Sequence, residues 1–385
     1  MKPTVPLQGR PEGALRRPAG RLEPQRAQPR LLGGVGLAAL VGLVGFAGFV
    51  GRVGAGGNAA PPAHPAPWVG PSSAGSWAPT TLTVQTNALI AEPGHPEGVV
   101  AATDDGVWRS GDGGTHWARL GTGLRGREVD ALAVTPGNRS LFAGAADGAV
   151  YALDAGRAGW RRLGAPLAAN PIYSLAVAAD GHRTVLAGTV GGLYRGTATG
   201  GWRWSHVAQT GDSAVSSIAW FSAAPQSAVA SVFGLSPPIL ATADDGRTWR
   251  TAATGLPSEL PTQALLALPA GRTRGSRLIL TTMGGGVWDR AATGPWRDIS
   301  AGLPSRHAMP LVALPSAETP VLYAGTMGDG VYVKQGDTAW RPLGHGLTGT
   351  DNTILAVAVA SGPDGSHPTL LAGTAHGVFR YLPAR

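Results

Sequence analysis

The side chains that most often carry out chemistry are sparse in this 385-residue chain. It contains no cysteine, which excludes disulfides, thiolate metal sites and a cysteine nucleophile. The nine histidines are scattered without the short spacings of a zinc site, and neither a phosphate-binding loop nor a nucleophile elbow is present. We therefore expect no metal, no cofactor and no catalytic residue.

Two carboxylates nevertheless stand in a fuller pattern. Asp112 and Asp244 each follow a hydroxyl residue by two positions and precede a glycine by two and a tryptophan by five. In a tight turn an Asp carboxylate accepts backbone N–H groups, a Gly adopts positive φ, and a Trp covers apolar surface between sheets. We expect a structural role for both turns, rather than catalysis or metal binding. The first comprises Ser110, Asp112, Gly114 and Trp117, and the second Thr242, Asp244, Gly246, Thr248 and Trp249.

The elements that carry these turns are repeated along the chain. A glycine followed by apolar and aromatic residues recurs, and a tryptophan comes eight or nine residues after the aromatic. Successive tryptophans are separated by 43, 42, 47, 47 and 44 residues, a period that fits four short strands with tight turns. They are Trp117, Trp160, Trp202, Trp249, Trp296 and Trp340.

Each repeat opens with a short apolar run, and seven such runs are expected to form inner strands: 87–91, 129–134, 172–177, 215–220, 262–268, 309–314 and 353–358. Four-stranded units arranged around an axis form a β-propeller. The last repeat lacks a tryptophan strand, whereas Trp77 stands before the first inner strand at the expected distance. The sequence predicts an all-β, seven-bladed β-propeller of four-stranded antiparallel blades, in which an N-terminal strand closes the last blade.

The two Asp-containing turns resemble Asp boxes, the bacterial neuraminidase repeat. The runs DDGVWRSGDGGTHWARLGTGL and TADDGRTWRTAATGLP look most like those of the photosystem II stability and assembly factor-like propellers, and similar repeats occur in sortilin-type receptors and sialidases. The resemblance spans about residues 77–385. It implies that the box lies on the hairpin between the outer strands, away from the ligand face, and it is specific for fold rather than function.

A sialidase-like glycoside hydrolase is the alternative function. Such enzymes use two acids, or a Tyr nucleophile beside a Glu and an arginine cluster. Only five glutamates follow residue 76, and the Phe/Tyr-Arg-Ile-Pro segment of sialidases is absent. A ligand-sensing receptor domain is a third possibility. We favour a non-catalytic scaffold that binds proteins or assembles a complex.

Propeller geometry predicts where a partner would bind. With the strands of a blade named A to D from the axis outward, the D-to-A connections share one face with the B-to-C turns, and we call this the DA face. Varied polar residues on a rigid scaffold often carry function. The candidates for binding a protein or peptide partner are Arg125, Arg127, Glu128, Asp212, Glu259, Arg306, His307 and Asp351, with Asp104, Asp105, Asp147, Asn170, Asp329, Asn352 and His376 in neighbouring loops.

The net charge of +8 is concentrated before the repeats. Residues 1–30 carry a net +5, whereas residue 53 onward carries 23 basic and 21 acidic residues. A nucleic-acid-binding protein should instead show a basic face on its folded domain. We therefore expect no nucleic-acid partner.

Residues 31–51 form an uncharged apolar run of 21 residues, long enough for a helix that spans a bilayer. Because the basic residues precede this run, we expect 1–30 to be a cytoplasmic tail and the propeller to lie outside the membrane. Residues 52–76 read as a Pro/Gly/Ala-rich stalk before a propeller over 77–385. The alternative is a secreted protein, cleaved after the apolar run.

Overall fold

The computed structural model describes residues 74–135, 140–168, 171–178, 184–221, 224–235, 238–252, 255–257, 260–269, 276–291, 294–314, 320–360 and 368–384. The expected cytoplasmic tail, membrane helix and most of the stalk lie outside these ranges. Within them, no helix has both the length and the apolarity needed to cross a bilayer.

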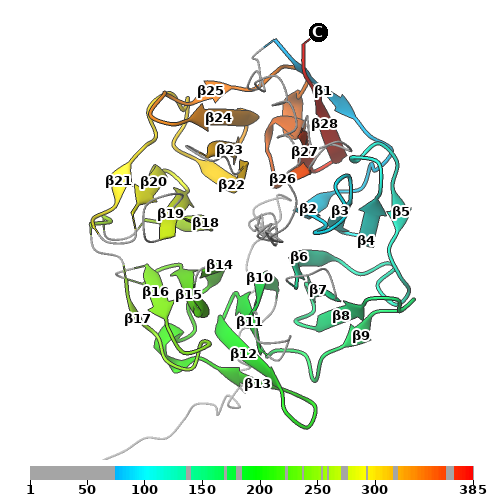
Figure 1. The fold of residues 1–385 in the computed structure, drawn as a ribbon, viewed down its shortest axis with the longest axis vertical. Coiled ribbons are helices and arrows are strands. Elements are labelled where there is room, and N and C mark those ends of the chain that lie inside the picture. Colours follow the sequence, from blue (N-terminus) through cyan, green and yellow to red (C-terminus); the bar gives the residue numbers. More distant parts are fainter. Residues whose placement is uncertain are drawn as a thin grey trace, which may run out of the picture. The chain divides into compact units, whose positions relative to one another are not determined.

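The described residues form seven four-stranded antiparallel sheets arranged around a common axis (Figure 1). Blades 1 to 6 are contiguous in sequence and run from β2–β5 to β22–β25. Blade 7 has the order β1-β28-β27-β26, with its outer strand taken from the other end of the described chain. The predicted all-β, seven-bladed propeller is confirmed.

Strands A and B lie nearest the axis. The A strands are β2 (Thr86–Ala91), β6 (Val129–Val134), β10 (Ile172–Val177), β14 (Val215–Phe221), β18 (Thr262–Pro269), β22 (Ala308–Leu314) and β26 (Ala356–Ala360). The B strands are β3 (Val99–Thr103), β7 (Ser140–Ala145), β11 (Thr184–Thr189), β15 (Ala224–Val232), β19 (Ser276–Thr282), β23 (Val321–Thr326) and β27 (Thr369–Thr374).

Strands C and D complete each blade. The C strands are β4 (Gly106–Ser110), β8 (Val150–Asp154), β12 (Gly192–Ala198), β16 (Ile239–Thr242), β20 (Gly286–Arg290), β24 (Val331–Gln335) and β28 (Gly377–Leu382). The D strands are β5 (Ala118–Arg119), β9 (Arg161–Arg162), β13 (Trp202–His206), β17 (Arg250–Thr251), β21 (Arg297–Asp298), β25 (Arg341–Pro342) and β1 (Ser76–Pro79). Short 3-10 turns, η1 (Ala208–Thr210) and η2 (Gly349–Asn352), lie in two of the D-to-A connections.

The hydrophobic core is divided among the seams between blades. Seven clusters of buried apolar side chains each join two neighbouring blades, so that the ring of seams is complete. Strands β10, β11 and β23 are buried along their whole length because both faces of a blade are covered. This explains why the inner strands read as continuous apolar runs rather than as alternating ones.

The closure predicted from Trp77 is present. In β1, Trp77 pairs with Tyr381 of β28 and Pro79 pairs with Phe379. The rings of Trp77 and Tyr381 meet edge to face at 5.5 Å, and the Trp77 indole N–H donates to the Leu343 carbonyl of blade 6 at 2.7 Å. One side chain therefore closes blade 7 and joins it to blade 6.

The same indole bond recurs around the ring, always to the first residue after the D strand of the preceding blade. Besides Trp77, it is made by Trp160 to Leu120 O (2.7 Å), Trp204 to Leu163 O (2.7 Å) and Trp340 to Ile299 O (2.8 Å). In blade 3 the bond is thus made by Trp204 and not by the repeat position Trp202, which stacks on Trp204 at 6.1 Å.

Blade 5 departs from this pattern. The equivalent acceptor, the Ala252 carbonyl of blade 4, is taken by the Arg290 guanidinium. The Trp296 indole nitrogen is consequently buried without a hydrogen-bond partner.

The last inner strand begins later than predicted. We expected 353–358, but β26 covers Ala356–Ala360. The connection from blade 6 forms η2 up to Asn352, and Thr353 donates its N–H to Thr350 O in that turn. The strand therefore starts only after the turn is complete.

Candidate docking face

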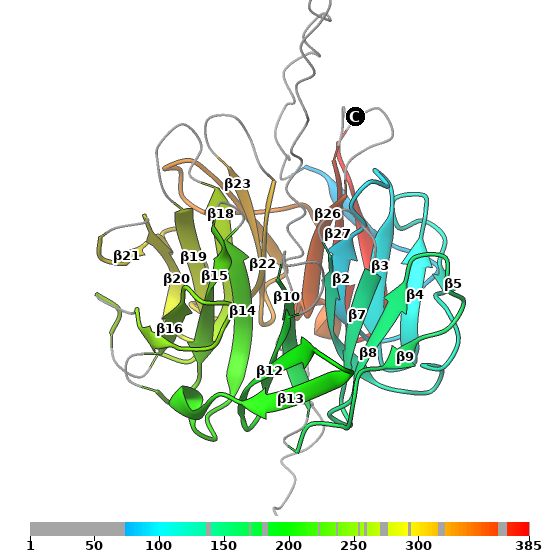
Figure 2. The same ribbon diagram turned by 60° about the horizontal axis from the view of Figure 1, so that its bottom comes forward.

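The structure places the predicted docking residues around the ring, in four separate connections. Arg125, Arg127 and Glu128 lie between blades 1 and 2, Asp212 between blades 3 and 4, Arg306 and His307 between blades 5 and 6, and Asp351 between blades 6 and 7. Glu259 and Asn170 lie outside the described residues. In Figure 2 the DA face is at the bottom, opposite the end of the molecule where the chain terminates.

Between blades 1 and 2, most of the charges are used within the face. The Arg127 guanidinium pairs with Asp147 at 2.7 Å and lies 6.0 Å from the Tyr151 ring centroid. Asp105 pairs with Arg119 and accepts the Gly126 N–H at 2.8 Å. The hydrogen bond from Arg119, followed by that from Gly126, lowers the pKa of Asp105.

On blades 5 to 7, charged side chains are also paired within the face. Arg306 pairs with Asp298 at 2.5 Å and donates to the Gly285 carbonyl at 2.8 Å. Asp351 accepts the Thr374 hydroxyl at 2.6 Å and contacts His376 Nδ1 at 3.0 Å. The Arg306 bond to Gly285 and the Asp351 contact with His376 each link a D-to-A connection to a B-to-C turn and so fix these loops relative to each other.

The sequence prediction missed a ring of buried residues at the start of the inner strands. In six of the described A strands a register shift directly after the first residue places the next side chain in a β-bulge. All six residues are at least 93% buried: Asn87, Asp130, Tyr173, Ser216, Gln263 and Met309. Asn87 Nδ2 and Ser216 Oγ each donate to the first carbonyl of the next A strand, at 3.1 and 2.9 Å.

Three carboxylates gather where this ring meets the DA face in blades 1 and 2. Asn87 Nδ2 lies 3.0 Å from Asp104 Oδ1 and 3.4 Å from Asp130 Oδ1, so that one amide bridges two acids. Burial, reinforced by the charges of Glu128 and Asp104, raises the pKa of Asp130 to about 8. Burial and the Asp104 charge also raise the pKa of Glu128. We call Asp104, Glu128 and Asp130 the acidic cluster.

The acidic cluster lacks a cation. Among the described residues none of its three carboxylates forms an ion pair, and Asp130 Oδ2 is buried with no hydrogen-bond partner. The signal that could have revealed Asp130 is a single charge inside an otherwise apolar inner strand, VDALAV. Side chains of that kind are rarely buried without a specific reason.

A second feature missed from sequence is apolar. Four large hydrophobic side chains of the described residues are exposed, and three of them, Val190, Phe233 and Met327, directly follow a B strand. Their exposed fractions are 40%, 50% and 42%. Met283 occupies the same turn position in blade 5 and is partly buried. We call Val190, Phe233, Met283 and Met327 the apolar arc, which extends over blades 3 to 6.

The turns that present these tips are held by a repeated bond. In five blades the last residue of strand B is a fully buried threonine whose hydroxyl donates to the carbonyl of the glycine that ends the turn, over 2.8–3.3 Å. These glycines have positive φ, and a Cβ at Gly377 would lie 2.0 Å from the Leu82 carbonyl oxygen. The B-to-C turns of these five blades, which carry Val190, Met283 and Met327 of the apolar arc, are therefore fixed. Blade 4, which carries Phe233, is not among them, because its strand B ends with Val232.

The two Asp-containing turns share one geometry. The carboxylates of Asp112 and Asp244 each accept two backbone N–H groups and the hydroxyl two residues earlier, and each Trp indole donates to the turn glycine, Gly114 or Gly246. Partial burial raises the pKa of Asp112, but hydrogen bonds from His116 and Ser110 outweigh it and bring the pKa to about 2. The Thr248 hydroxyl and N–H are the main reason that the pKa of Asp244 is also about 2.

Each of these turns lies between strands C and D and contacts the preceding blade. Arg380 of blade 7 donates to the Thr115 hydroxyl at 3.0 Å, and Arg195 of blade 3 donates to the Asp245 carbonyl at 2.7 Å. The two arginines hold the same position in strand C, immediately after its aromatic residue. Blades 1 and 4 are thus fastened to the preceding blade by an Asp-containing turn, where blades 2, 3, 6 and 7 use an indole bond and blade 5 uses Arg290.

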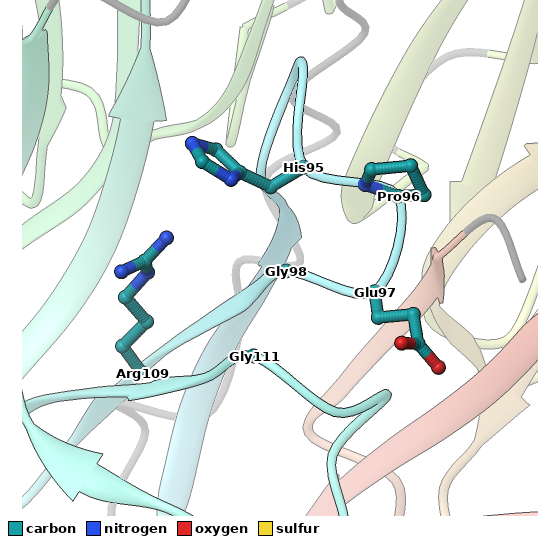
Figure 3. Close-up of a pocket in the computed structure, with 6 residues that line it drawn as sticks. All are labelled: His95, Pro96, Glu97, Gly98, Arg109 and Gly111. Atoms are coloured by element: carbon teal, nitrogen blue, oxygen red, sulfur yellow. The ribbon is translucent and has the colours of Figure 1, made fainter. Parts of the chain in front are cut away.

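A shallow cavity of about 240 Å³ lies beside the first of these turns, away from the DA face (Figure 3). His95 and Arg109 are on the same side of its opening, and the Glu97 carboxylate is turned away from them (Figure 3). Arg109 Nε is paired with Glu92 at 2.7 Å. The cavity therefore offers no pair of facing acids.

No group of His, Asp or Glu side chains in the described ranges is placed to hold a metal ion. Among the described carboxyls, that of Asp130 has a strongly raised pKa, and this residue is only 1% exposed. What the DA face presents is fixed turns, a cluster of carboxylates and exposed apolar side chains.

Comparisons with known proteins support the fold. The chain matches no protein-family model and no curated protein. It is similar to three solved propellers: a GH74 enzyme from Niastella koreensis (13% identity over 78% of this chain and 43% of that one, TM-score 0.60), the GH74 xyloglucanase from Xanthomonas campestris (18%, 80% and 53%, 0.57) and the WD40 β-propeller domain of Doa1 (13%, 82% and 97%, 0.59). The chain spans about half the length of the GH74 enzymes it matches. At these identities the likeness shows the propeller fold alone.

Proposed function

We propose that this protein is a non-catalytic propeller whose DA face binds a protein or peptide partner, as a scaffold for a complex outside the membrane. The observation that carries the proposal is the repeated exposure of Val190, Phe233 and Met327 at one turn position. Scattered exposed hydrophobics need no explanation, but a set gathered on one face of a rigid fold is typical of an interaction surface.

The finer assignment follows the sequence resemblance. The shared geometry of the Asp112 and Asp244 turns supports membership among Asp-box propellers of the assembly-factor-like type. The apolar run over residues 31–51 supports an uncleaved membrane anchor, with the propeller on the far side from the basic tail. Secretion after cleavage is the competing arrangement.

The test is site-specific photo-crosslinking in native membranes. A crosslinking amino acid replaces Arg125, which is exposed on the DA face, and in the matched control it replaces Arg203, which is exposed on the outer strand β13. We expect a discrete adduct with a second protein from position 125 and none from position 203. Equal labelling from both positions, or none from either, would refute a partner on this face.

A charge-reversal variant gives a second reading. Arg125, Arg127 and Arg306 are all exposed, so that replacing all three by Glu should cost little stability. Recovery of the crosslinked partner by pull-down should fall at least about tenfold, because Arg127 and Arg306 no longer hold the loops of the DA face through Asp147 and Gly285. A tenfold loss corresponds to about 1.4 kcal/mol of binding free energy. Unchanged recovery would remove these arginines from the interface.

The second candidate is a glycoside hydrolase. The fold likeness to GH74 enzymes favours it, as does the gathering of three carboxylates on the DA face. Incubation of the purified chain with a fluorogenic sialoside and with xyloglucan decides the matter. Turnover that is lost in Glu128→Gln would replace the scaffold proposal with an enzyme.

A further inference from the structure

The charges of the DA face do not balance locally, and the imbalance lies in the acidic cluster. Elsewhere on this face, three acids are paired with bases: Asp147 with Arg127, Asp298 with Arg306, and Asp351 with His376. Asp212 and Asp329 are single acids that form no ion pair among the described residues, and Asp329 accepts the Ser305 hydroxyl at 2.7 Å, so that the acidic cluster is the place where several unpaired acids gather. Among the described residues, the carboxylates of the acidic cluster accept side-chain hydrogen bonds from the uncharged amides of Gln85 and Asn87 alone.

A buried atom in this cluster also lacks a donor. Asp130 Oδ2 has no hydrogen-bond partner although the residue is 99% buried, and such orphaned atoms are uncommon in native proteins. The described residues provide no metal-binding arrangement at this point. Asp104 and Glu128 are exposed, so that a guanidinium or ammonium group arriving from solvent would meet acceptors that none of the described residues uses as an ion-pair partner.

The apolar arc lies across the axis from the acidic cluster. Asp104 and Phe233 follow the B strands of blades 1 and 4, so that they are equivalent turn tips on the same face. Apart from Met1, the chain has three methionines: Met283 and Met327 in the apolar arc, and the buried Met309 in the ring of bulges. Methionine is unbranched and polarizable, and it adapts to varied apolar partners.

We propose that the DA face recognises an extended protein segment that combines a basic side chain with large apolar side chains. The basic group is held by the acidic cluster of blades 1 and 2, and the apolar side chains cover the arc over blades 3 to 6. This inference rests on the proposed function, which it deepens by assigning the chemistry of the partner. Opposite charge selects the segment and sets its direction, while apolar contact supplies most of the affinity.

The test is selection from an array of random 12-residue peptides by the full chain. We expect the selected peptides to be enriched in Arg or Lys within a few positions of Leu, Ile, Phe or Met. The variant pair Asp104→Asn/Glu128→Gln should lower their affinity at least about tenfold and remove the preference for basic residues. The variant pair Phe233→Ser/Met327→Ser should lower affinity similarly but keep that preference.

Two control variants distinguish an effect at the proposed site from an effect of any exposed residue. Leu382→Ser alters an equally exposed hydrophobic residue at the end of β28, and Glu97→Gln alters an acid beside the shallow cavity. Both should bind like the unmodified chain. Near- and far-ultraviolet circular dichroism melting curves that match those of the parent would show that the variants are folded.

The possible failures are distinguishable. If a native partner crosslinks from position 125 but its binding is unaffected by Asp104→Asn/Glu128→Gln, the scaffold function stands and the assigned chemistry is wrong. Selected peptides that are acidic or indifferent to charge would overturn it as well, as would the absence of any selected peptide. Crosslinks to a second copy of this chain would make the DA face a self-association surface instead.

Discussion

At the scale of single residues, the Asp-containing turns show how a carboxylate substitutes for missing backbone partners. Asp244 accepts the N–H groups of Arg247 and Thr248 at 3.1 and 2.9 Å and the hydroxyl groups of Thr242 and Thr248 at 2.7 and 2.6 Å. We predict that Asp244→Ala lowers the free energy of unfolding by about 1–2 kcal/mol, because several charge-assisted bonds are lost from an exposed turn. Urea denaturation at pH 7 measures the loss.

The difference in the free energy of unfolding between the parent and Asp244→Ala should depend on pH. The pKa of Asp244 is about 2 in the folded state, below the value of about 4 in an unfolded chain. A carboxyl with a depressed pKa stabilises the fold above pH 4, and this contribution disappears as the pH falls through about 2. The gap between the parent and Asp244→Ala should therefore narrow between pH 4 and pH 2. A gap that stays constant over that range would contradict the assignment.

Asp130 should change the stability with pH in the opposite direction to Asp244. Burial raises its folded pKa to about 8, so that the folded state holds a proton that the unfolded chain releases near pH 4. Stability should fall as the pH rises from about 4 to about 8. We predict that Asp130→Asn removes this decline and melts higher than the parent at pH 8.5, by roughly 2–4 °C for each kcal/mol relieved. Parallel thermal melts at pH 5 and pH 8.5 test it, and the two proteins should differ least at pH 5.

At the scale of elements, the tryptophans offer a matched comparison. Trp340 donates its indole N–H to Ile299 O at 2.8 Å, whereas the Trp296 nitrogen is buried without a partner. Replacement by Phe removes similar apolar volume at both positions, but only Trp340→Phe breaks a hydrogen bond. We predict that Trp340→Phe costs about 1 kcal/mol more than Trp296→Phe in urea denaturation. Equal losses would mean that the indole bond contributes nothing to the seam.

Repetition is what made the elements predictable from sequence. Because each blade uses the same order of strands, weak local signals added up across seven copies, and even the pairing of Trp77 with the last blade could be anticipated. Deviations confined to a single blade could not be predicted in this way. In blade 3, Trp204 rather than Trp202 bonds to the Leu163 carbonyl, and in blade 5, Arg290 rather than Trp296 bonds to the Ala252 carbonyl. Each outcome depends on which side chain of one blade reaches a carbonyl of its neighbour.

The candidate site was harder to predict than the fold. The repeat pattern placed Arg127 and Arg306 in D-to-A connections, where the structure has them, but it did not reveal that both are already paired within the face. The bulge that buries Asp130 arises from a register shift between two strands, which period-two patterning does not encode. Phe233 and Met327 follow apolar strands directly, so that in sequence they read as the ends of those strands.

At the scale of the whole molecule, the ring has one closure, made by β1 on β28. Trp77 is 4% exposed, contacts Tyr381 and bonds to Leu343 of the neighbouring blade. We predict that Trp77→Ala lowers the free energy of unfolding by about 3–5 kcal/mol, because a large buried ring is removed. Hydrogen exchange should quicken first at the amides of Gly377–Leu382. Uniform acceleration across all blades would instead indicate that the ring opens as one unit.

The distance in sequence between β1 and β28 has a consequence for how this protein folds during synthesis. The strand around Trp77 leaves the ribosome before any blade, yet the residues it pairs with come roughly 300 positions later. At about 5–20 residues per second, that interval lasts on the order of 15–60 s. Throughout it, an apolar ribbon stays unpaired while six blades take shape behind it. A premature stop anywhere before Gly377 would leave β1 permanently unpaired, and chaperones and proteases should then recognise the product as incomplete.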